Sequence, residues 1–587
     1  MTKKNGGGLV KKDVPKELRE ELKEFPELLS KLLFHRGIKS KEDADRFLNP
    51  VYAPHDPFFM KGMKEGVERL IEAFQKGERI TIFSDYDADG IPGAVLMSDF
   101  FDKIGYDNFD VYIPDRHTEG FGLNEYAINE IADRKSKLII TIDCGVADEA
   151  EIVLAKSLGV EVIVTDHHTP TQGVPSAKVV IDPKQDGCQY PDKNLCGAGV
   201  AFKFVEASLS VLRSEAFKIK NSSLKIGAIS AIPEGWQKWL LDMVGIATLS
   251  DMVPLVGENR MFAKYGLAVL RKSPRPGLNA LFRTLRINRA NLSEEDIAFS
   301  ISPRINAASR MGSPMTAFRL LRTKEELEAV TLARELEKLN SERKGVVAGM
   351  IKEIKHMAKE RGVENKKVIV MGSPSWRPAL LGLAAGNVAE EYGRPVFLWG
   401  RDTETTLKGS CRGAAGVDIL ELMQNAGDIF IEFGGHAAAG GFSVALDRVH
   451  LLEDKLELAI EKCLSGNAEV DSRIQADHVF KIGDLDWKII SDLEKLSPFG
   501  VGNPKPVFLF EKMPIHEVRQ FGKDNIHLAL RFLGENNQKI EAISFFTSPQ
   551  SFGQPLLEGN EVSLLAHVEQ SNYGGNRDIR LRIVDVF

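Results

Sequence analysis

The chain of 587 residues has few cysteines, and none of them forms a C-x-x-C pair. An odd number of cysteines does not suit a disulfide framework, and a structural zinc site normally needs paired cysteines or a cysteine–histidine pattern. We therefore expect neither disulfides nor structural zinc, and the reducing cytoplasm is the predicted compartment. The five positions are Cys144, Cys188, Cys196, Cys411 and Cys463.

Long apolar runs and a basic net charge are also missing. The sequence has no stretch of about 18 apolar residues, the length that a membrane-spanning helix needs, so no membrane span is expected. The first residues, MTKKNGGGLVKKD, carry charge and glycine but no apolar segment, which predicts a disordered tail and not a secretory signal. Because the net charge is −7, any binding of nucleic acid has to come from a local basic surface.

Several domains are expected from the order of the hydrophobic patterns. LREELKEFPELLSKLLF is helical in its spacing, and from residue 79 short apolar runs (ITIF, VYIP, KLIITID, VEVIVTD, AKVVIDP) alternate with helical segments. That alternation is typical of βαβ units in a mostly parallel sheet. ISPRINAASRMG, from residue 301, is rich in small and polar residues and is predicted to be a loop. The predicted divisions are an N-terminal tail and helical segment (1–75), a parallel-sheet domain (76–322), a linker helix (323–362), a second α/β domain (363–470) and a C-terminal β-barrel (471–587).

The C-terminal barrel is predicted from five strand candidates separated by turn residues. They are VFLFEKMPIHEVRQFG, IHLALRFLG, QKIEAISFF, EVSLLAHVEQ and RDIRLRIVDVF. Five short strands in this order favour an antiparallel barrel of the OB type, a fold that often binds single-stranded nucleic acid.

Carboxylates and histidines follow several of the predicted parallel strands. TIFSDYDADG places Asp85, Asp87 and Asp89 directly after a strand, and Gly90 and Gly93 allow the chain to turn sharply into the next helix. Three carboxylates this close repel one another unless a cation lies among them, although a solvated loop is the alternative.

Further acidic and imidazole groups end other strands and one helix. Asp143 ends LIITID, Asp166, His167 and His168 end VEVIVT, and Asp251 follows the helical run GIATLS. Any single one of these aspartates could be a helix N-cap. Because the carboxyl ends of parallel strands meet at one edge of the sheet, we expect the set to converge there and to bind divalent metal ions.

The motifs DYDADG, DCG, DHH and SDMVPL, in this order, resemble the four motifs of the DHH phosphoesterase family. The similarity runs from about residue 30 to the C-terminus and includes PDRHTEGFGLN, PRINAASRMG, KGSCRG, FGGHAAAGG, SPFGVGNPKP and SNYGGNRDIRLRIVDVF. It implies an α/β fold in which a DHH parallel-sheet lobe is joined by a long helix to a second, DHHA1-type lobe, with an OB-like barrel after it. Within the family, the resemblance is greatest to single-strand-specific 5′→3′ DNA exonucleases that act in DNA repair and recombination.

By this resemblance, two divalent cations would be bound, with Mn²⁺ preferred and Mg²⁺ possible. Their predicted ligands are Asp87, Asp89, Asp143, His167 and Asp251, with Asp143 between the two ions. Such a pair of ions activates water and stabilises the negative charge that develops during phosphodiester hydrolysis.

The other predicted catalytic residues are His168, Asp85 and Asp166. His168 is predicted to donate a hydrogen bond to a phosphate oxygen or to orient the nucleophile. Asp85 and Asp166 are predicted to orient the metal ligands, and a capping role is the alternative for both.

Residues of both lobes are predicted to bind the substrate. The resemblance implies a pocket for the 5′-terminal phosphate that includes Arg116, Ser410 and Arg412, because arginine grips phosphate oxygens bidentately. Arg304, Asn306, Arg310 and His436 are candidates for further phosphate contacts. Each arginine taken alone could equally be an ordinary surface residue.

Two features depart from what the resemblance implies. Arg377, in SWRPALLGLAAG, stands where the family usually has histidine, so a guanidinium either replaces that contact or leaves it absent. The residues from 471 onward contain 13 lysines and arginines against 16 aspartates and glutamates. The barrel must therefore gather its positive residues on one face or bind weakly; the candidates are Arg519, Lys523, Arg531, Arg580 and Arg582, with Tyr573 and Phe521 as candidates for stacking.

The predicted partner is the 5′ end of single-stranded DNA, with a single-strand-binding protein and a helicase as further candidates and a monomer as the expected state. A phosphodiesterase that acts on short oligoribonucleotides or cyclic dinucleotides is the alternative enzyme, and a catalytically silent DNA-binding relative is the alternative outside enzymes. The appended barrel favours long polymers, and the presence of every ligand residue argues against a silent relative.

Overall fold

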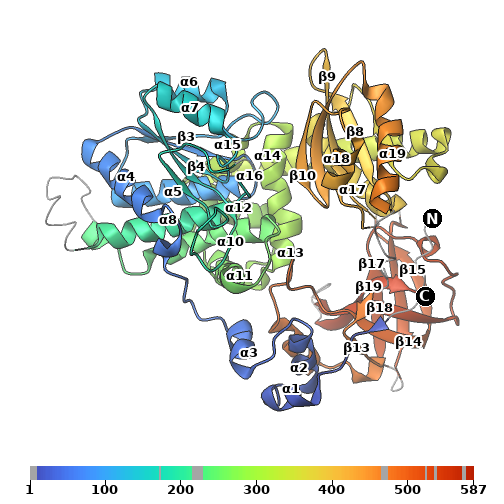
Figure 1. The fold of residues 1–587 in the computed structure, drawn as a ribbon. Helices are drawn as coiled ribbons and strands as arrows, with labels where there is room; N and C mark the ends of the chain where they lie inside the picture. The colour runs from blue at the N-terminus through green and yellow to red at the C-terminus, as the bar shows by residue number, and fades with distance from the viewer. Residues whose placement is uncertain are drawn as a thin grey trace. The chain divides into compact units, whose positions relative to one another are not determined.

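The chain folds into two compact units (Figure 1). The computed structural model describes residues 9–170, 173–214, 229–414, 416–464, 474–522, 525–534, 538–571 and 577–587. The large unit comprises residues 54–253 and 257–470, and the small unit comprises residues 1–53, 254–256 and 471–587. Among the described residues, no helix combines the length and the apolar character needed to cross a membrane.

The first sheet of the large unit is parallel throughout and has the strand order β3-β2-β4-β5-β6. Its strands β2 and β4 are buried at every residue, as expected for a parallel sheet with both faces covered. Helices α6 and α7 pack on one face, and α5 and α8 lie on the other (Figure 1). The strands are β2 (Ile80–Ser84), β3 (Phe109–Tyr112), β4 (Leu138–Ile142), β5 (Glu161–Thr165) and β6 (Val179–Ile181).

The helices that surround this sheet follow the predicted alternation of strand and helix. They are α4 (Met63–Lys76), α5 (Gly90–Ile104), α6 (Glu125–Asp133), α7 (Glu149–Ser157), α8 (Gly197–Leu212), α10 (Leu241–Ser250), α11 (Gly257–Leu270), α12 (Pro276–Leu285), α13 (Glu294–Asp296), α14 (Ser302–Met311) and α15 (Pro314–Arg322). The predicted loop at 301–312 is wrong, because Ser302–Met311 is helix α14. Its three consecutive small residues Ala307, Ala308 and Ser309 are buried, so packing, not exposure, explains their small size.

The predicted long helix is confirmed as α16 (Glu326–Arg361), which packs against α12 and α14 of the first lobe and α17 of the second. The second lobe has the strand order β10-β11-β9-β8-β7, in which only β7 and β8 pair in parallel. Its elements are β7 (Ile369–Gly372), α17 (Pro378–Tyr392), β8 (Val396–Arg401), β9 (Thr406–Arg412), α18 (Ile419–Ala426), β10 (Glu432–His436), β11 (Ala439–Ala445) and α19 (Leu452–Leu464).

The small unit contains the predicted barrel, whose sheet has the order β13-β14-β18-β19-β17-β16-β15. The first strand candidate forms two strands, β14 and β15, which pair with β18 and β16 respectively; β15 is one edge of the sheet, and β14 lies next to β13 at the other edge. The pairing of β17 with β19 is parallel, which corrects the purely antiparallel prediction. The elements are β12 (Gln475–Ala476), β13 (His478–Val479), α20 (Trp487–Glu494), β14 (Phe508–Pro514), β15 (Glu517–Phe521), β16 (His527–Leu533), β17 (Lys539–Ser544), β18 (Glu561–Ser571) and β19 (Asp578–Val586).

The N-terminal helices belong to the same unit as the barrel. Apolar residues of α2 (Glu27–Phe34) and α3 (Lys41–Leu48), with Leu22 after α1 (Lys16–Glu21), share one core with the barrel strands. Leu9–Val10 forms β1, which pairs with β12, so part of the predicted tail is ordered structure; residues 1–8 lie outside the described residues. The predicted boundary at residue 75 also differs from this division, because α4 packs on α8 and β6 of the large unit.

Asp477 forms a cluster of ionic hydrogen bonds with Lys11, which follows β1, and His35, which follows α2. Oδ1 of Asp477 lies 2.8 Å from Nζ of Lys11 and 2.9 Å from Nδ1 of His35, and Oδ2 accepts a hydrogen bond from Val507 N. Burial opposes the charged carboxylate, but these hydrogen bonds outweigh it and lower the pKa of Asp477 to about 2. The ordinary pKa of an aspartate is about 3.9, so the cluster stabilises the small unit by about 2 kcal/mol above pH 4.

Because the pKa of Asp477 is lowered in the folded state, this stabilisation should be lost as pH falls from about 4 to about 2. Asp477→Asn should remove it at neutral pH, so the protection factors of the amides across β12–β14 should be about 30-fold lower and should no longer change with pH in this window. Glu20→Gln, which removes an exposed ion pair with Lys23 in the same unit, is the control and should leave exchange unchanged. Equal protection in both variants would contradict the prediction.

Candidate functional site

Four adjacent strands of the first sheet each end in an aspartate, and these aspartates lie in one row. Ser84, Ile142, Thr165 and Ile181 are in register across β2, β4, β5 and β6. The residues that follow them are therefore neighbours in the same order: Asp85, Asp143, Asp166 and Asp182. Backbone hydrogen bonds continue the ladder to the first three of them, at 3.0–3.2 Å. The predicted convergence of the strand-end groups at one edge is thus present in the structure.

The turn after β2 holds the first carboxylates through its own backbone. Oδ1 of Asp87 accepts hydrogen bonds from Asp89 N, at 2.8 Å, and from Gly90 N, at 3.2 Å. A Cβ atom on Gly90 would lie 2.4 Å from the carbonyl oxygen of Asp85, so only glycine fits at this point. The DYDADG stretch therefore folds into a tight turn that presents two carboxylates above the edge of the sheet.

His167 is the centre of the cluster of predicted metal ligands. Its Nε2 lies 3.1 Å from Oδ1 of Asp143, 3.8 Å from Oδ2 of Asp89 and 3.7 Å from Oδ2 of Asp251. Asp251 reaches this point from the C-terminus of α10. All four side chains are at least three-quarters buried, so their interactions are little screened by water.

The ligand atoms form three overlapping groups, within each of which they lie no more than 4.8 Å apart. The groups are Asp85–Asp87–Asp143, Asp89–His167–Asp251 and Asp143–His167–His168. Asp143 belongs to two of the groups, which is the arrangement that a carboxylate between two ions needs. Oxygen donors with one imidazole suit Mn²⁺ and Mg²⁺, and Oδ1 of Asp85 is buried without a hydrogen-bond partner. On donor chemistry and on this unpartnered oxygen, the residues fit divalent cations.

The pKa values of these side chains also favour bound cations. Burial and the neighbouring carboxylates raise the pKa of Asp89 to about 7 and of Asp251 to about 9, and they raise the pKa values of Asp85 and Asp143 well above the ordinary range. Burial lowers the pKa of His167 to about 3, so its imidazole is neutral, as a metal ligand must be. The cluster thus contains crowded carboxylates and no cationic ligand of its own, and cations among them would relieve the repulsion.

Asp166 and His168 form a pair beside this cluster. Oδ1 of Asp166 accepts hydrogen bonds from Nδ1 of His168, at 2.8 Å, and from two backbone N–H groups, and Oδ2 accepts one from Val146 N. Burial alone would lower the pKa of His168, but the hydrogen bond to Asp166 outweighs it and raises the pKa to about 9. Asp166 therefore orients a protonated His168 whose Nε2 is left for another partner.

The first turn of helix α8 contacts the side chains of Asp89 and Asp143. Both oxygens of Asp89 accept hydrogen bonds from the first turn of α8, from Gly197 N at 2.6 Å and from Ala198 N at 2.8 Å. A Cβ atom on Gly197 would lie 2.5 Å from the Cβ of Asp143, so this helix start must be glycine. The positive end of the helix dipole thus faces the carboxylate row.

Sequence reasoning missed two parts of this arrangement. Asp182 is fully buried, its Oδ2 has no hydrogen-bond partner, and burial raises its pKa to about 7. The stretch VVIDP gave the same signal as the other strand ends and could have identified it. Gly197 and Ala198 had no comparable signal, because backbone donors cannot be recognised from residue types.

A cavity of about 950 Å³ in the large unit is lined by both lobes. Its lining includes five of the predicted substrate residues: Arg116, Arg310, Ser410, Arg412 and His436. In the described part of the chain, none of the three arginines has an ion-pair partner. The guanidinium of Arg116 lies 4.7 Å from the ring centre of Tyr86, Arg310 donates to Ala379 O, and Arg412 donates to Ser410 Oγ at 3.0 Å.

Burial and the nearby charge of Arg116 lower the pKa of Arg310 to about 9. Burial also lowers the pKa of Arg412. Buried guanidinium groups without carboxylate partners are costly unless an anion pairs with them. The cavity therefore suits an anion such as a phosphate group.

Two predicted contacts, Arg304 and Asn306, have other surroundings, and so does Arg377, whose role the sequence left open. Arg304 is buried and bonded to Glu337, at 2.8 Å, and to Ser300 O, and it does not line the cavity. Asn306 accepts a hydrogen bond from Ala88 N, at 2.9 Å, so it holds the turn after β2. Arg377 is exposed at the N-cap of α17 without a side-chain capping bond, and it also lies outside the cavity lining.

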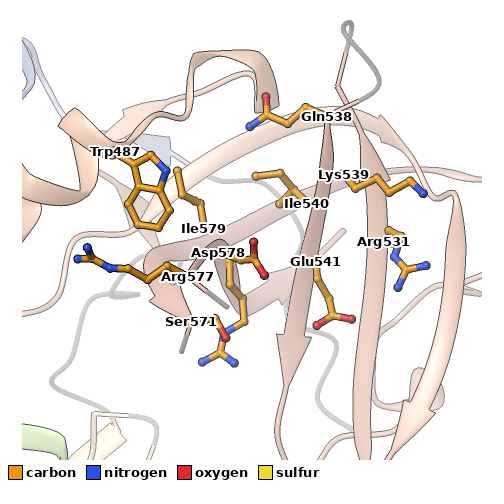
Figure 2. A pocket seen from close by; sticks show the side chains of 11 residues that line it. Trp487, Arg531, Gln538, Lys539, Ile540, Glu541, Ser571, Arg577, Asp578 and Ile579 are labelled. Atoms are coloured by element: carbon orange, nitrogen blue, oxygen red, sulfur yellow. The ribbon is translucent and has the colours of Figure 1, made fainter. Parts of the chain in front are cut away.

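The barrel has a separate pocket of about 610 Å³ in which basic residues gather (Figure 2). Arg531 and Arg580, both predicted, line it together with Lys539 and Arg577. The guanidinium of Arg577 lies 5.5 Å from the ring centre of Trp487, which is 45% exposed and comes from α20. The other predicted cations lie elsewhere: Arg519 pairs with Glu541, and Arg582 lies near the ring of Phe545.

Trp487 is the exposed aromatic residue of this pocket, and sequence reasoning missed it because it precedes the barrel strands. Phe521 packs instead against His527 and Phe545. Lys523 and Tyr573, two further predictions, lie outside the described residues.

Comparisons with known proteins agree with this fold. Three family models match: the DHH family N-terminal domain over residues 79–230, the DHHA1 domain over 365–463 and the RecJ OB domain over 476–585. The single-stranded-DNA-specific exonuclease RecJ of Bacillus subtilis is 34% identical over 98% of this chain and 69% of its own length.

Two crystal structures of RecJ from Thermus thermophilus have a similar fold. The complex with Mn²⁺ has a TM-score of 0.79 at 28% identity, covering 99% of this chain and 79% of that one. The complex with Mg²⁺ has a TM-score of 0.74 at 27% identity, covering 98% and 78%. The predicted fold class, with DHH, DHHA1-type and OB-like parts, is confirmed, and so is the resemblance from which it came.

Proposed function

The chain belongs to the RecJ family of single-stranded-DNA-specific exonucleases, and from that premise we propose that it removes 5′-mononucleotides from the 5′ end of single-stranded DNA by hydrolysis assisted by divalent cations. The observation that carries the proposal is the row of strand-end aspartates next to a cavity lined by unpaired arginines. The carboxylates and His167 supply a metal site, and the arginines supply a phosphate site beside it.

Divalent cations fit the carboxylate cluster, and the proposed ligands are Asp87, Asp89, Asp143, His167 and Asp251. We propose two ions, Mn²⁺ in preference to Mg²⁺, with Asp143 between them. When bound, such ions lower the pKa of water and stabilise negative charge on the oxygens around phosphorus. Asp85, with its unpartnered Oδ1 beside Asp87 and Asp143, is a further candidate ligand.

The chain's own residues prepare the phosphodiester for attack. Asp166 holds Nδ1 of His168, so the protonated ring can donate its Nε2–H to a non-bridging phosphate oxygen. Asn306 fixes the turn that carries Asp87 and Asp89 through Ala88 N. The first turn of α8 fixes the carboxylate of Asp89, so these ligands are oriented before substrate binds.

The direction of cleavage follows in this proposal from the phosphate site. A terminal 5′-phosphate held by Arg116, Ser410 and Arg412 would stop the strand from advancing further, so only the first linkages would reach the carboxylate cluster. Arg310 and His436 line the same cavity and would contact phosphate as well. Arg304 could contribute only by leaving Glu337.

The pocket of the barrel supports a polymeric substrate. Exposed Trp487 offers a stacking surface for a base, and Lys539 and Arg577 offer charge for the backbone (Figure 2). Arg531 is paired with Glu517 and Arg580 with Glu569, and Glu541 and Asp578 also line the pocket, so Lys539 and Arg577 supply its positive charge in a barrel that is acidic as a whole. We also propose that the protein acts in DNA repair and recombination and works as a monomer. Its proposed protein partners are a single-strand-binding protein and a helicase.

The function is tested with single strands of DNA and RNA labelled at either end, in Mn²⁺, Mg²⁺ or EDTA. We expect mononucleotides to be released from the 5′ end of DNA, most rapidly with Mn²⁺, and no turnover in EDTA. A long strand should be degraded at lower concentration than a strand of five nucleotides, and Trp487→Ala should reduce this advantage severalfold, since stacking contributes about 1–3 kcal/mol per base. Release from the 3′ end, or turnover in EDTA, would refute the proposal.

A further inference from the structure

We propose that Gly382 is a positioning residue that determines how strongly the enzyme prefers 5′-phosphorylated ends, because its missing side chain leaves the space in which the Arg412 guanidinium lies. The inference rests on the proposed function, in which Arg412 and Ser410 bind the terminal phosphate. Gly382 belongs to helix α17, which the sequence analysis did not connect with that pocket.

The first turns of α17 form one wall of the cavity. Pro378, Ala379 and Gly382 line it together with Ser410 and Arg412 of β9. α17 packs closely on β9 and β8. A side chain added on this face of α17 would therefore contact side chains that project from β9.

The space at Gly382 is already occupied by the phosphate-site residues. A Cβ atom built on Gly382 would lie 2.6 Å from Nη2 of Arg412 and 3.0 Å from Oγ of Ser410. The first distance is shorter than real Cβ atoms permit, so one partner has to move. Both neighbours are side-chain atoms, and Nη2 is the far end of a long flexible side chain, so the guanidinium moves and the backbone stays.

Moving the guanidinium would break a defined arrangement. Arg412 Nη1 donates to Ser410 Oγ, at 3.0 Å, and to the carbonyl oxygen of Cys411, at 2.7 Å. These bonds aim the remaining N–H groups of Arg412, and only a fixed fork grips a phosphate bidentately. The start of α17 also holds a second arginine of the cavity, because Ala379 O accepts a hydrogen bond from Arg310.

A glycine inside a helix makes the helix less stable than alanine would, and the proposed role explains why glycine is present at position 382. Alanine is favoured over glycine in helix interiors, and Gly382 has ordinary helical backbone angles, so nothing in the backbone requires glycine here. Gly386 lies one turn further along the same helix, and a Cβ atom there would meet nothing within 4 Å. Replacing either glycine by alanine adds one methyl group to the same helix, but only the methyl group at position 382 would have neighbouring atoms within 4 Å.

The test compares Gly382→Ala with Gly386→Ala on oligonucleotides that carry a 5′-phosphate or a 5′-hydroxyl. For Gly382→Ala we expect KM on phosphorylated strands to rise about tenfold, the loss expected for one charge-assisted hydrogen bond, with kcat and the activity on hydroxyl ends within twofold of wild type. Gly386→Ala should match wild type on both substrates. Both variants should melt at or above the wild-type temperature.

Two further variants distinguish failure of the role of Gly382 from failure of the proposed phosphate site at Arg412. Arg412→Ala should lose the preference for phosphorylated ends, and adding Gly382→Ala to it should change nothing more, since the two residues act through one contact. In an Arg412→Lys background, which lacks Nη2, Gly382→Ala should also have no effect. A full preference in Gly382→Ala, while Arg412→Ala has lost it, would overturn the role of Gly382 alone. A full preference in Arg412→Ala would overturn the phosphate site itself and this inference with it.

Discussion

Replacing Asp143 by asparagine should reduce hydrolysis of single-stranded DNA to less than about a hundredth of wild type at saturating Mn²⁺. Asp143 belongs to two of the three ligand groups, so removal of its charge weakens both positions where a cation fits. Asparagine is the suitable replacement because Asp143 has a φ of 64°, a conformation that asparagine tolerates better than alanine. The measurement is kcat on a 5′-labelled strand.

The same substitution should leave the folded protein more stable in EDTA. Asp143 is buried, and burial together with the charges of Asp85, Asp87, Asp89 and Asp251 raises its pKa well above the ordinary range, so without cations its ionised form is disfavoured. The melting temperature in EDTA should therefore rise, and the increase that Mn²⁺ gives to wild type should largely disappear.

The control for Asp143→Asn is Asp148→Asn. It changes a largely buried carboxylate outside the three ligand groups, whose Oδ2 accepts a hydrogen bond from Leu123 N, and it should keep activity within about fivefold. Asp143→Asn with more than a hundredth of wild-type turnover would count against Asp143 as the residue between two ions.

Replacing Arg412 by alanine should reduce the preference for phosphorylated over hydroxyl 5′ ends by about 10- to 100-fold. Arg412 is largely buried, has a lowered pKa and bonds only to Ser410 Oγ and Cys411 O among the described groups, so its charge is available to an anion in the cavity. The loss should appear in KM for phosphorylated strands, because Arg412 belongs to the second lobe and the predicted metal ligands to the first.

Arg448→Ala provides the comparison for this prediction. Arg448 lies in the same lobe but forms an exposed ion pair with Asp428, so its removal should leave the end preference unchanged. Similar preferences in Arg412→Ala and wild type would move the phosphate site to another part of the cavity.

The strand-end residues of the first sheet could be predicted because one physical rule governs them. Apolar runs identify β2, β4 and β5, and parallel pairing brings their ends together, so the first aspartate that follows each of these strands in the sequence lies in the row that the structure contains. Asp182 obeys the same rule, although the sequence analysis did not single it out.

Other parts of the site could not be read from residue types. Arg304 and Arg310 both occur in PRINAASRMG, yet α14 directs Arg310 into the cavity and Arg304 to Glu337, a difference that depends on the helix that was predicted to be a loop. Trp487 stands 21 positions before Phe508, where β14 begins, so no pattern of the long barrel strands includes it. The absence of a side chain at Gly382 has meaning only once its neighbours in space are known.

The small unit is built from both ends of the chain, with the whole large unit inserted between them. On the ribosome, α2 and α3 are therefore synthesised before the large unit, whereas the barrel strands that share a core with Leu29, Leu32 and Leu33 are synthesised after it. A nascent or truncated chain that lacks these strands would expose the apolar face of the N-terminal helices for the entire time that it takes to synthesise the large unit.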